Sequence, residues 1–194
     1  ISWYNLANSL IYLGRFNDAI KSYDKAIELN PNYYSAYYDK GMALAQRGRY
    51  RAALRCYDMV LLRKPKDANA LYRKGFILEE MGKPKKALAC YEKTLAINPD
   101  STEAWNAKGR ALCALERYED ALDAYERGLK LSPTSEELWN NKGFTYFMLG
   151  LIDEATKCYD EAIKLNSRYR DAWYNKGYAL HGGDRLAEAV ECYR

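Results

Sequence analysis

Hydrophobic and polar positions along the chain recur every 34 residues, and the register holds without insertion or deletion over the whole sequence. One column holds large side chains, at Trp3, Tyr37, Leu71, Trp105, Trp139 and Trp173. Two other columns never vary: alanine at positions 19, 53, 87, 121, 155 and 189, and tyrosine at positions 23, 57, 91, 125, 159 and 193. Trp105, Gly109 and Leu112 have the i, i+4, i+7 spacing of one helix face, and Ala121 and Tyr125 start a second such stretch. Each repeat therefore predicts two helices.

Short turns separate the predicted helices. A glycine occupies the first turn of four repeats, where the backbone must be permissive: Gly14, Gly48, Gly82 and Gly150. A proline follows the second helix of four repeats, at Pro31, Pro65, Pro99 and Pro133, and Ser167 takes its place in the fifth. We expect about eleven or twelve helices and no strand. The chain should pass Ser167 without disruption, because Asn166 and Ser167 still form a stop and a cap.

These intervals carry a resemblance to a known family. Trp, Gly, Leu, Gly, an aromatic residue, Ala, Tyr, Ala and Pro in this order resemble the tetratricopeptide repeat over the whole chain. The resemblance implies an all-α fold, a right-handed α-solenoid of antiparallel helix pairs (the TPR superhelix) with a concave groove, in one array over residues 1–194. Its expected repeats are 1–33, 34–67, 68–101, 102–135, 136–169 and 170–194, the first and last incomplete. A related RNA-binding repeat has a period that is one residue longer. That period would shift the aligned columns by one residue per repeat, and no such shift occurs.

Composition is that of an ordinary water-soluble protein, with 48% hydrophobic and 29% charged residues. No apolar run approaches the ~20 residues of a membrane helix, so no membrane partner is expected. Five cysteines without a C-x-x-C pair indicate free thiols in a reducing compartment, and a cytoplasmic location is expected. Because the chain begins at Ile1 and stops at Arg194 inside a helical pattern, we interpret it as an excerpt of a longer polypeptide.

A lysine column lies beside the glycine of the first helix in five repeats, at Lys40, Lys74, Lys108, Lys142 and Lys176. On a helical wheel with ~100° per residue, this column lies about 60° from the core stripe. Small neighbouring residues leave room for the lysine stems. Each lysine follows by 16 residues an acid of the preceding repeat, in the column Asp24, Asp58, Glu92, Glu126 and Asp160. We predict inter-repeat ion pairs, such as Lys74 with Asp58 and Lys108 with Glu92, worth ~0–1 kcal/mol each. The alternative is solvated charges above packed stems.

Candidate catalytic groups are scarce. His181 is the only histidine, which excludes paired imidazole chemistry and a histidine-rich zinc site, and we expect it on the surface. Four cysteines share one column, at Cys56, Cys90, Cys158 and Cys192. Helix packing should separate them by ~8–10 Å or more, which is beyond the reach of a disulfide. We therefore expect them to be small hydrophobic residues of the core. Cys113 alone points toward the groove by its wheel position. No glycine-rich phosphate loop occurs, and we expect no enzyme activity, no metal site and no cofactor.

Function is therefore expected on the first helix of each pair, which the resemblance places along the groove. The predicted partner-binding residues are aromatic and amide-bearing toward the two ends and carry mixed charge in the middle. They are Tyr4, Asn5, Asn8, Tyr12, Tyr38, Met42, Tyr72, Arg73, Phe76, Glu79, Asn106, Arg110, Asn140, Asn141, Phe144, Phe147, Met148, Tyr174, Asn175 and Tyr178.

This pattern favours an extended peptide as ligand, because amides can bond any peptide backbone while Tyr, Phe and Met supply apolar pockets. In some family members a ladder of groove asparagines holds the ligand backbone; here Asn5, Asn141 and Asn175 match that column. The prediction is a non-catalytic protein-interaction scaffold that binds a protein or peptide segment. Two other functions stay open: the targeting arm of a larger enzyme such as a glycosyltransferase, and RNA binding. For any single aromatic residue, packing between repeats is the alternative role.

Charge is unevenly distributed. Residues 34–67 carry eight Lys or Arg against three Asp or Glu, whereas residues 102–169 carry nine against twelve. Arg47, Arg49, Arg51 and Arg55 lie at a turn and on the outer face of a second helix. An acidic partner, or simple solvation, fits this short patch off the groove better than nucleic acid does. The ends of the array also predict end-to-end self-association of the excerpt, because a solenoid without capping helices exposes faces meant for a neighbour.

Overall fold

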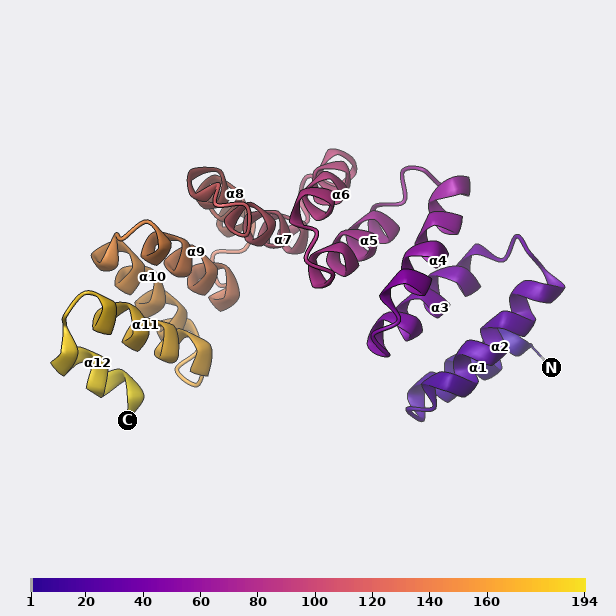
Figure 1. Cartoon of the computed structure of the whole chain (residues 1–194), viewed down its shortest axis with the longest axis horizontal. Coiled ribbons are helices and arrows are strands. Elements are labelled where there is room, and N and C mark those ends of the chain that lie inside the picture. Colours follow the sequence, from indigo (N-terminus) through magenta and orange to yellow (C-terminus); the bar gives the residue numbers. More distant parts are fainter. Residues whose placement is uncertain (1) are drawn as a thin grey trace. The chain divides into compact units, whose positions relative to one another are not determined.

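The structure, a computed structural model, describes residues 2–194, and these form twelve α-helices and no strand (Figure 1). The helices are α1 (Trp3–Tyr12), α2 (Phe16–Leu29), α3 (Tyr34–Gln46), α4 (Tyr50–Arg63), α5 (Ala68–Glu80), α6 (Pro84–Ile97), α7 (Thr102–Cys113), α8 (Tyr118–Leu131), α9 (Glu136–Met148), α10 (Ile152–Leu165), α11 (Arg170–Gly182) and α12 (Leu186–Tyr193). The predicted all-α fold of repeated helix pairs is confirmed.

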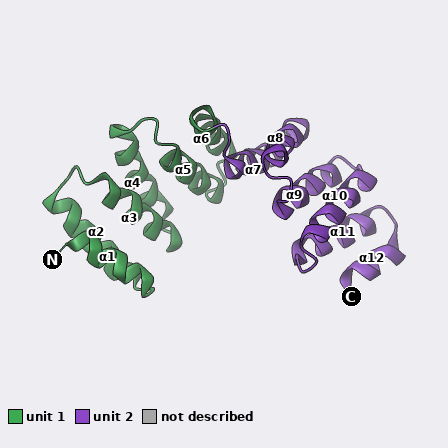
Figure 2. Cartoon of the chain, turned by 180° about the vertical axis from the view of Figure 1, so that it is seen from behind, with its two compact units in different colours: residues 1–98 green, residues 99–194 purple. Residues whose placement is uncertain are grey.

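Two compact units divide the chain, Ile1–Asn98 and Pro99–Arg194 (Figure 2). Each contains three helix pairs, α1–α6 in the first unit and α7–α12 in the second. Within each unit, every helix packs against the next one in sequence. In the second unit the first helices of successive pairs, α7, α9 and α11, also pack against one another. The single array expected over residues 1–194 stays a prediction.

In five of the six pairs a tyrosine ring of the second helix packs on a glycine of the first helix, and Ala7 takes the place of the glycine in the first pair. Tyr91 of α6 is fully buried, and a Cβ built on Gly75 of α5 would lie 2.6 Å from its ring. The same contact joins Tyr159 of α10 to Gly143 of α9 at 2.8 Å. The alanine column lies in the same layer and is buried in every repeat. A side chain larger than hydrogen at Gly75 or Gly143 would force the tyrosine ring or the helices to move, and this explains the glycine at these positions.

The turn within each pair needs a left-handed backbone. Four of the six turns supply glycine there, with φ of 71° at Gly14, 68° at Gly48, 66° at Gly82 and 76° at Gly150, as predicted. The other two turns place Glu116 and Asp184 in that conformation, each with φ of 58°. A side chain in this region is strained, because its Cβ crowds the backbone.

The chain passes Ser167 without disruption, as predicted. Trp173 of α11 donates its indole N–H to the carbonyl oxygen of Ser167 at 3.0 Å, and Trp139 of α9 bonds Pro133 in the same way. The position thus contributes its backbone, and a proline ring is not required for the contact. Asn166 ends α10 as its C-cap residue, as expected. The expected cap of the next helix is wrong, because Tyr169 is the N-cap residue of α11 and makes no side-chain capping bond.

Ion pairs join the lysine column to the acids of the preceding repeat. The Nζ–Oδ1 distance is 2.6 Å for both Lys74 with Asp58 and Lys176 with Asp160, and Lys142 lies 3.1 Å from Glu126. Lys40 pairs with Asp24 in the same register. The fifth expected pair, Lys108 with Glu92, would span the two units and stays a prediction.

Tryptophan rings also contact the lysines of the fifth and sixth repeats. The ammonium of Lys142 lies 5.6 Å from the ring centre of Trp139, and that of Lys176 lies 5.9 Å from Trp173. Lys142 keeps only 12% of its side chain exposed, so its stem packs while its charge meets both a ring and a carboxylate. Both predicted features, the packed stem and the inter-repeat ion pair, are therefore present together.

Candidate functional site

In the first unit, three of the six residues predicted from α1 and α3, namely Asn8, Tyr12 and Met42, line a cavity of about 380 Å³. Its lining is Asn8, Ile11, Tyr12, Tyr23, Asp39, Met42, Ala43 and Gln46. Tyr23 donates its hydroxyl hydrogen to the Oδ1 of Asn8 at 2.6 Å, which fixes the asparagine amide at the cavity wall. Tyr12 belongs to this lining, and its side chain is 92% exposed. The lining therefore offers both polar and apolar contacts to a single ligand side chain that enters the cavity.

Tyr4 and Asp39 connect the first two repeats beside this cavity. The Tyr4 hydroxyl donates to the Oδ2 of Asp39 at 2.6 Å, and the Tyr4 ring lies 4.8 Å from that of Tyr33. Burial raises the pKa of Tyr4, and the hydrogen bond to Asp39 raises it further. Tyr4 therefore remains a protonated donor at neutral pH. Asn5, which precedes Asp39 in the ladder column, is exposed on α1.

The predicted residues of α5 are divided between packing contacts and exposed positions. The Tyr72 ring lies 5.8 Å from that of the buried Tyr91, so much of it serves packing. Glu79 accepts a hydrogen bond of 2.6 Å from the Tyr91 hydroxyl, which satisfies the buried phenol. Phe76 and Arg73 are exposed on this helix. Tyr38 of α3 likewise packs edge-on against Tyr57, with ring centres 5.6 Å apart.

In the second unit, asparagine side chains form hydrogen bonds from repeat to repeat. Asn141 donates its Nδ2 hydrogen to the Oδ1 of Asn106 at 2.9 Å, and Asn175 donates to Asn140 at 3.0 Å. Asn106 in turn donates to Glu137 at 2.8 Å. The donors Asn141 and Asn175 are half-buried, and each retains a second amide hydrogen and oxygen lone pairs. The bonds hold these amides in fixed orientations.

Two of the predicted contact residues do not lie on an open surface. Asn106 is 7% exposed and Asn140 is 6% exposed, because the asparagine of the next repeat covers each of them. Their predicted role as direct groove contacts is corrected to support of Asn141 and Asn175. Arg110 is half-buried and lies 3.4 Å from Glu137. Glu137 was not predicted as a site residue from the sequence. Its position one turn before Asn141 on the same helix could have indicated it.

The largest exposed apolar surface of the predicted set lies on α9 and α11. We call it the aromatic surface, and it consists of Phe144, Phe147, Met148, Tyr174 and Tyr178. Tyr178 packs edge-on against Phe147 at 5.4 Å and nearly parallel to Tyr174 at 6.4 Å. The exposed fractions of Tyr174, Tyr178, Met148 and Phe144 are 61%, 52%, 45% and 42%. Rings that support one another and remain open to solvent are typical of a binding surface.

The aromatic surface adjoins the asparagine hydrogen bonds. Asn141 and Phe144 are one turn apart on α9, and Asn175 and Tyr178 are one turn apart on α11. Each of these helices therefore carries an oriented amide beside an exposed ring. Tyr193 of α12 also contacts the surface, with its ring 6.2 Å from Tyr174, and sequence reasoning placed it only in the core column.

Cys113 and His181, the other candidate chemical groups, differ in their exposure to solvent. Cys113 is half-buried, and its Sγ lies 3.2 Å from the Oγ1 of Thr145, so the expected groove exposure is only partial. Burial raises the pKa of the Cys113 thiol, which keeps it protonated. His181 is exposed, as predicted. All five cysteines are free thiols, and three of the four in the shared column are buried.

Within residues 2–194, no group of three or more His, Cys, Asp or Glu side chains could hold a metal ion. None of the helices described there is both long and apolar enough to cross a membrane.

Comparison with known families identifies the repeat. Models of the tetratricopeptide repeat match residues 1–33, 22–55, 72–136, 136–169 and 171–194. No curated protein matches the sequence.

Solved structures share the fold. A tetratricopeptide repeat protein from Parabacteroides merdae superposes with a TM-score of 0.90 over 98% of this chain and 75% of its own, at 20% identity. MamA residues 41 to the end from Desulfovibrio magneticus RS-1 give 0.82 over 86% and 94%, at 24% identity. YrrB, described as a TPR protein with an unusual peptide-binding site, gives 0.76 over 90% of each chain at 25% identity.

Proposed function

Because the chain belongs to the tetratricopeptide repeat family, we propose that it is a non-catalytic interaction scaffold that binds an extended segment of a partner protein. The aromatic surface on α9 and α11 carries the proposal. It offers four exposed large side chains at one place, beside two amides held by Asn106 and Asn140.

The chemistry of this surface suits a peptide in extended form. Phenylalanine and tyrosine contribute large contact areas at low conformational cost, and the flexible methionine can adapt its shape to a ligand. Apolar side chains of a ligand can therefore pack among them. Asn141 and Asn175 can then bond the ligand backbone with their remaining donors and acceptors. YrrB, a protein of the same family at 25% identity, has a peptide-binding site according to its description, which supports this class of ligand.

Peptide-library selection tests the proposal. The native chain should enrich peptides that contain aromatic or aliphatic residues, and the double variant Phe144→Ala with Tyr178→Ala should not retain them. The matched control is Leu29→Ala with Leu62→Ala, which removes two large side chains that are 73% and 77% exposed on α2 and α4. Selected peptides that bind the aromatic double variant as well as the native chain would contradict the proposal.

A further inference from the structure

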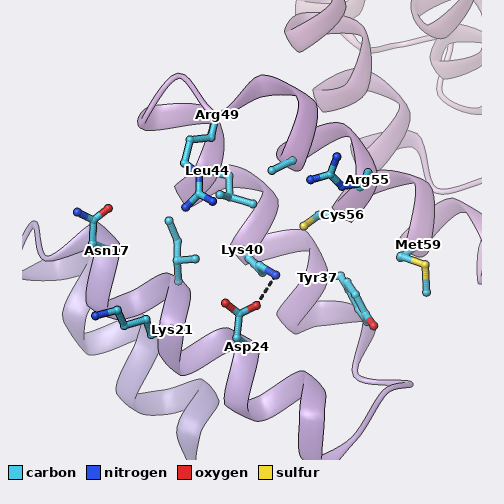
Figure 3. A pocket seen from close by; sticks show the side chains of 12 residues that line it. Asn17, Lys21, Asp24, Tyr37, Lys40, Leu44, Arg49, Arg55, Cys56 and Met59 are labelled. Atoms are coloured by element: carbon cyan, nitrogen blue, oxygen red, sulfur yellow. Dashed lines mark ion pairs between the residues drawn. The ribbon is translucent and has the colours of Figure 1, made fainter.

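A second pocket lies among α2, α3 and α4 of the first unit, with a volume of about 500 Å³ (Figure 3). It shares no lining residue with the cavity between α1 and α3. We call it the basic pocket, and it is lined by Asn17, Ile20, Lys21, Asp24, Tyr37, Lys40, Leu44, Arg49, Ala52, Arg55, Cys56 and Met59. Four cationic side chains face one carboxylate in this set. The pocket therefore has an excess of positive charge and a partly apolar floor.

One of these charges is already neutralised. Lys40 pairs with Asp24 at the middle of the pocket (Figure 3). Lys21, Arg49 and Arg55 form no ion pair within the described part of the chain. Figure 3 shows Arg49 and Arg55 on the α4 side of the Lys40–Asp24 pair, with Lys21 on α2. Three cations are thus available to a ligand, and the only carboxylate is occupied.

The repeat architecture does not impose this charge. The equivalent positions between repeats four and five carry a different set, namely Glu119, Asp123, Glu126, Lys142, Leu151, Glu154 and Lys157. Acids outnumber bases there, although the fold and the lysine–acid pair are the same. The equivalent positions between repeats two and three are also basic, with Arg51, Arg55, Lys74, Lys83, Lys86 and Lys93 against Asp58. Excess positive charge is therefore a property of the first three repeats, and a general demand of helix packing does not account for it.

Ala52 explains why space is left open. The equivalent positions of the other five repeats hold longer side chains: Asp18, Lys86, Asp120, Glu154 and Glu188. At Ala52 only a methyl group projects from the first turn of α4, between Arg49 and Arg55. The half-buried Tyr37 and Met59 complete the wall with apolar surface.

We propose that the basic pocket is a second binding site, and that it takes a short acidic segment of a partner protein. Aspartate or glutamate side chains enter between Arg49 and Arg55, whose guanidinium groups form charge-assisted hydrogen bonds with carboxylates. An apolar side chain of the same segment lies on Met59 and Tyr37. The mixed lining favours a peptide over nucleic acid, because the pocket offers a single ring and some apolar surface, whereas a nucleic acid needs a row of cations and several stacking platforms.

This site is separate from the aromatic surface on α9 and α11, so one chain could engage two segments. The two proposals can be tested separately. The aromatic surface lies on α9 and α11 and would bind apolar side chains, whereas the basic pocket lies among α2, α3 and α4 and would bind carboxylates. Binding of an acidic peptide should survive the double variant Phe144→Ala with Tyr178→Ala.

The test is a titration of a fluorescent peptide, in which aspartates flank a single leucine, followed by fluorescence anisotropy. The native chain should bind it, and Arg49→Gln with Arg55→Gln should weaken binding about tenfold or more. The matched control is Arg47→Gln with Arg51→Gln, which removes the same charge from neighbouring exposed positions outside the pocket. This control should stay within about twofold of the native chain.

Four results would overturn the proposal. They are no measurable binding, an equal loss in both arginine pairs, loss of binding in the aromatic double variant, and stronger binding of single-stranded RNA at the same two arginines. The equal loss would mean that the peptide senses only the overall charge. The RNA result would assign the pocket to nucleic acid.

Discussion

The indole N–H of Trp173 donates to the carbonyl oxygen of Ser167 at 3.0 Å, in the contact that Trp139 makes with Pro133. Because the contact uses the backbone of residue 167, the residue type there is free to vary. The preceding residue, Asn166, has φ −140° and ψ 94°, close to the −142° and 91° of Asn30 before Pro31. The backbone at residue 166 is thus already suited to a proline on its carboxyl side, at position 167.

Ser167→Pro should therefore stabilise the chain by about 0.4–1 kcal/mol, because proline reduces the freedom of the unfolded state at a compatible position. Chemical denaturation measures the change. Asn166→Pro is the contrasting variant and should destabilise, since the Asn166 N–H bonds the carbonyl oxygen of Ala162 at 3.0 Å. A destabilising Ser167→Pro would show that the two loops differ.

Glycine at position 116 should also stabilise the chain. Glu116 has φ of 58° where four other repeats place glycine, so Glu116→Gly relieves strain of about 1 kcal/mol, partly offset by unfolded-state entropy. The converse change, Gly150→Ala, should cost about 1 kcal/mol for the same reason. Denaturation midpoints that move in the same direction for both variants would contradict this explanation.

Alanine at the core glycines should have graded effects. A Cβ at Gly109 would lie 2.4 Å from the Tyr125 ring, whereas at Gly41 it would lie 3.0 Å from that of Tyr57. Gly109→Ala should destabilise by about 1–3 kcal/mol through overpacking. Gly41→Ala should cost less, because a small shift of the ring suffices and alanine gains about 1 kcal/mol of helix propensity. Equal losses of unfolding free energy would show that ring contact does not decide these positions.

Alkaline pH should weaken the fold. Burial raises the pKa of the Cys158 thiol from 9.0 to about 11, so the folded chain keeps a proton that the unfolded chain releases. Stability is unaffected by this thiol below pH 9 and falls as the pH rises from 9 toward 11. The free energy of unfolding should show a shallower alkaline decline for Cys158→Ser than for the native chain. Equal slopes would mean that Cys158 titrates alike in both states.

Much of the fold follows from the sequence, because the repeat makes each local signal appear several times. The helix pairs, the left-handed glycine turns and the Lys74–Asp58 contact depend on periodicity and on neighbours at fixed intervals, which 34-residue columns reveal directly. Backbone geometry sets these features, so they recur with little change from one repeat to the next.

The candidate site was harder to predict, because it depends on how individual side chains meet. A helical wheel places both Asn106 and Asn141 on the groove side, yet one is buried by the other. Wheel angles also cannot show that Tyr38 packs on Tyr57 while Tyr178 stays open. The basic pocket depends on the absence of a long side chain at Ala52, and no residue pattern on a single helix reports that absence.

The central claim, that the aromatic surface binds a partner segment, is tested most directly by the affinity of a library-selected peptide. Native chain, Phe144→Ala with Tyr178→Ala, and Leu29→Ala with Leu62→Ala would be titrated with the same labelled peptide, with circular dichroism to confirm helical folding. We predict that the aromatic double variant binds at least about tenfold more weakly, as expected for buried aromatic anchors, while the leucine control binds like the native chain. Equal affinity of all three folded proteins would contradict the account.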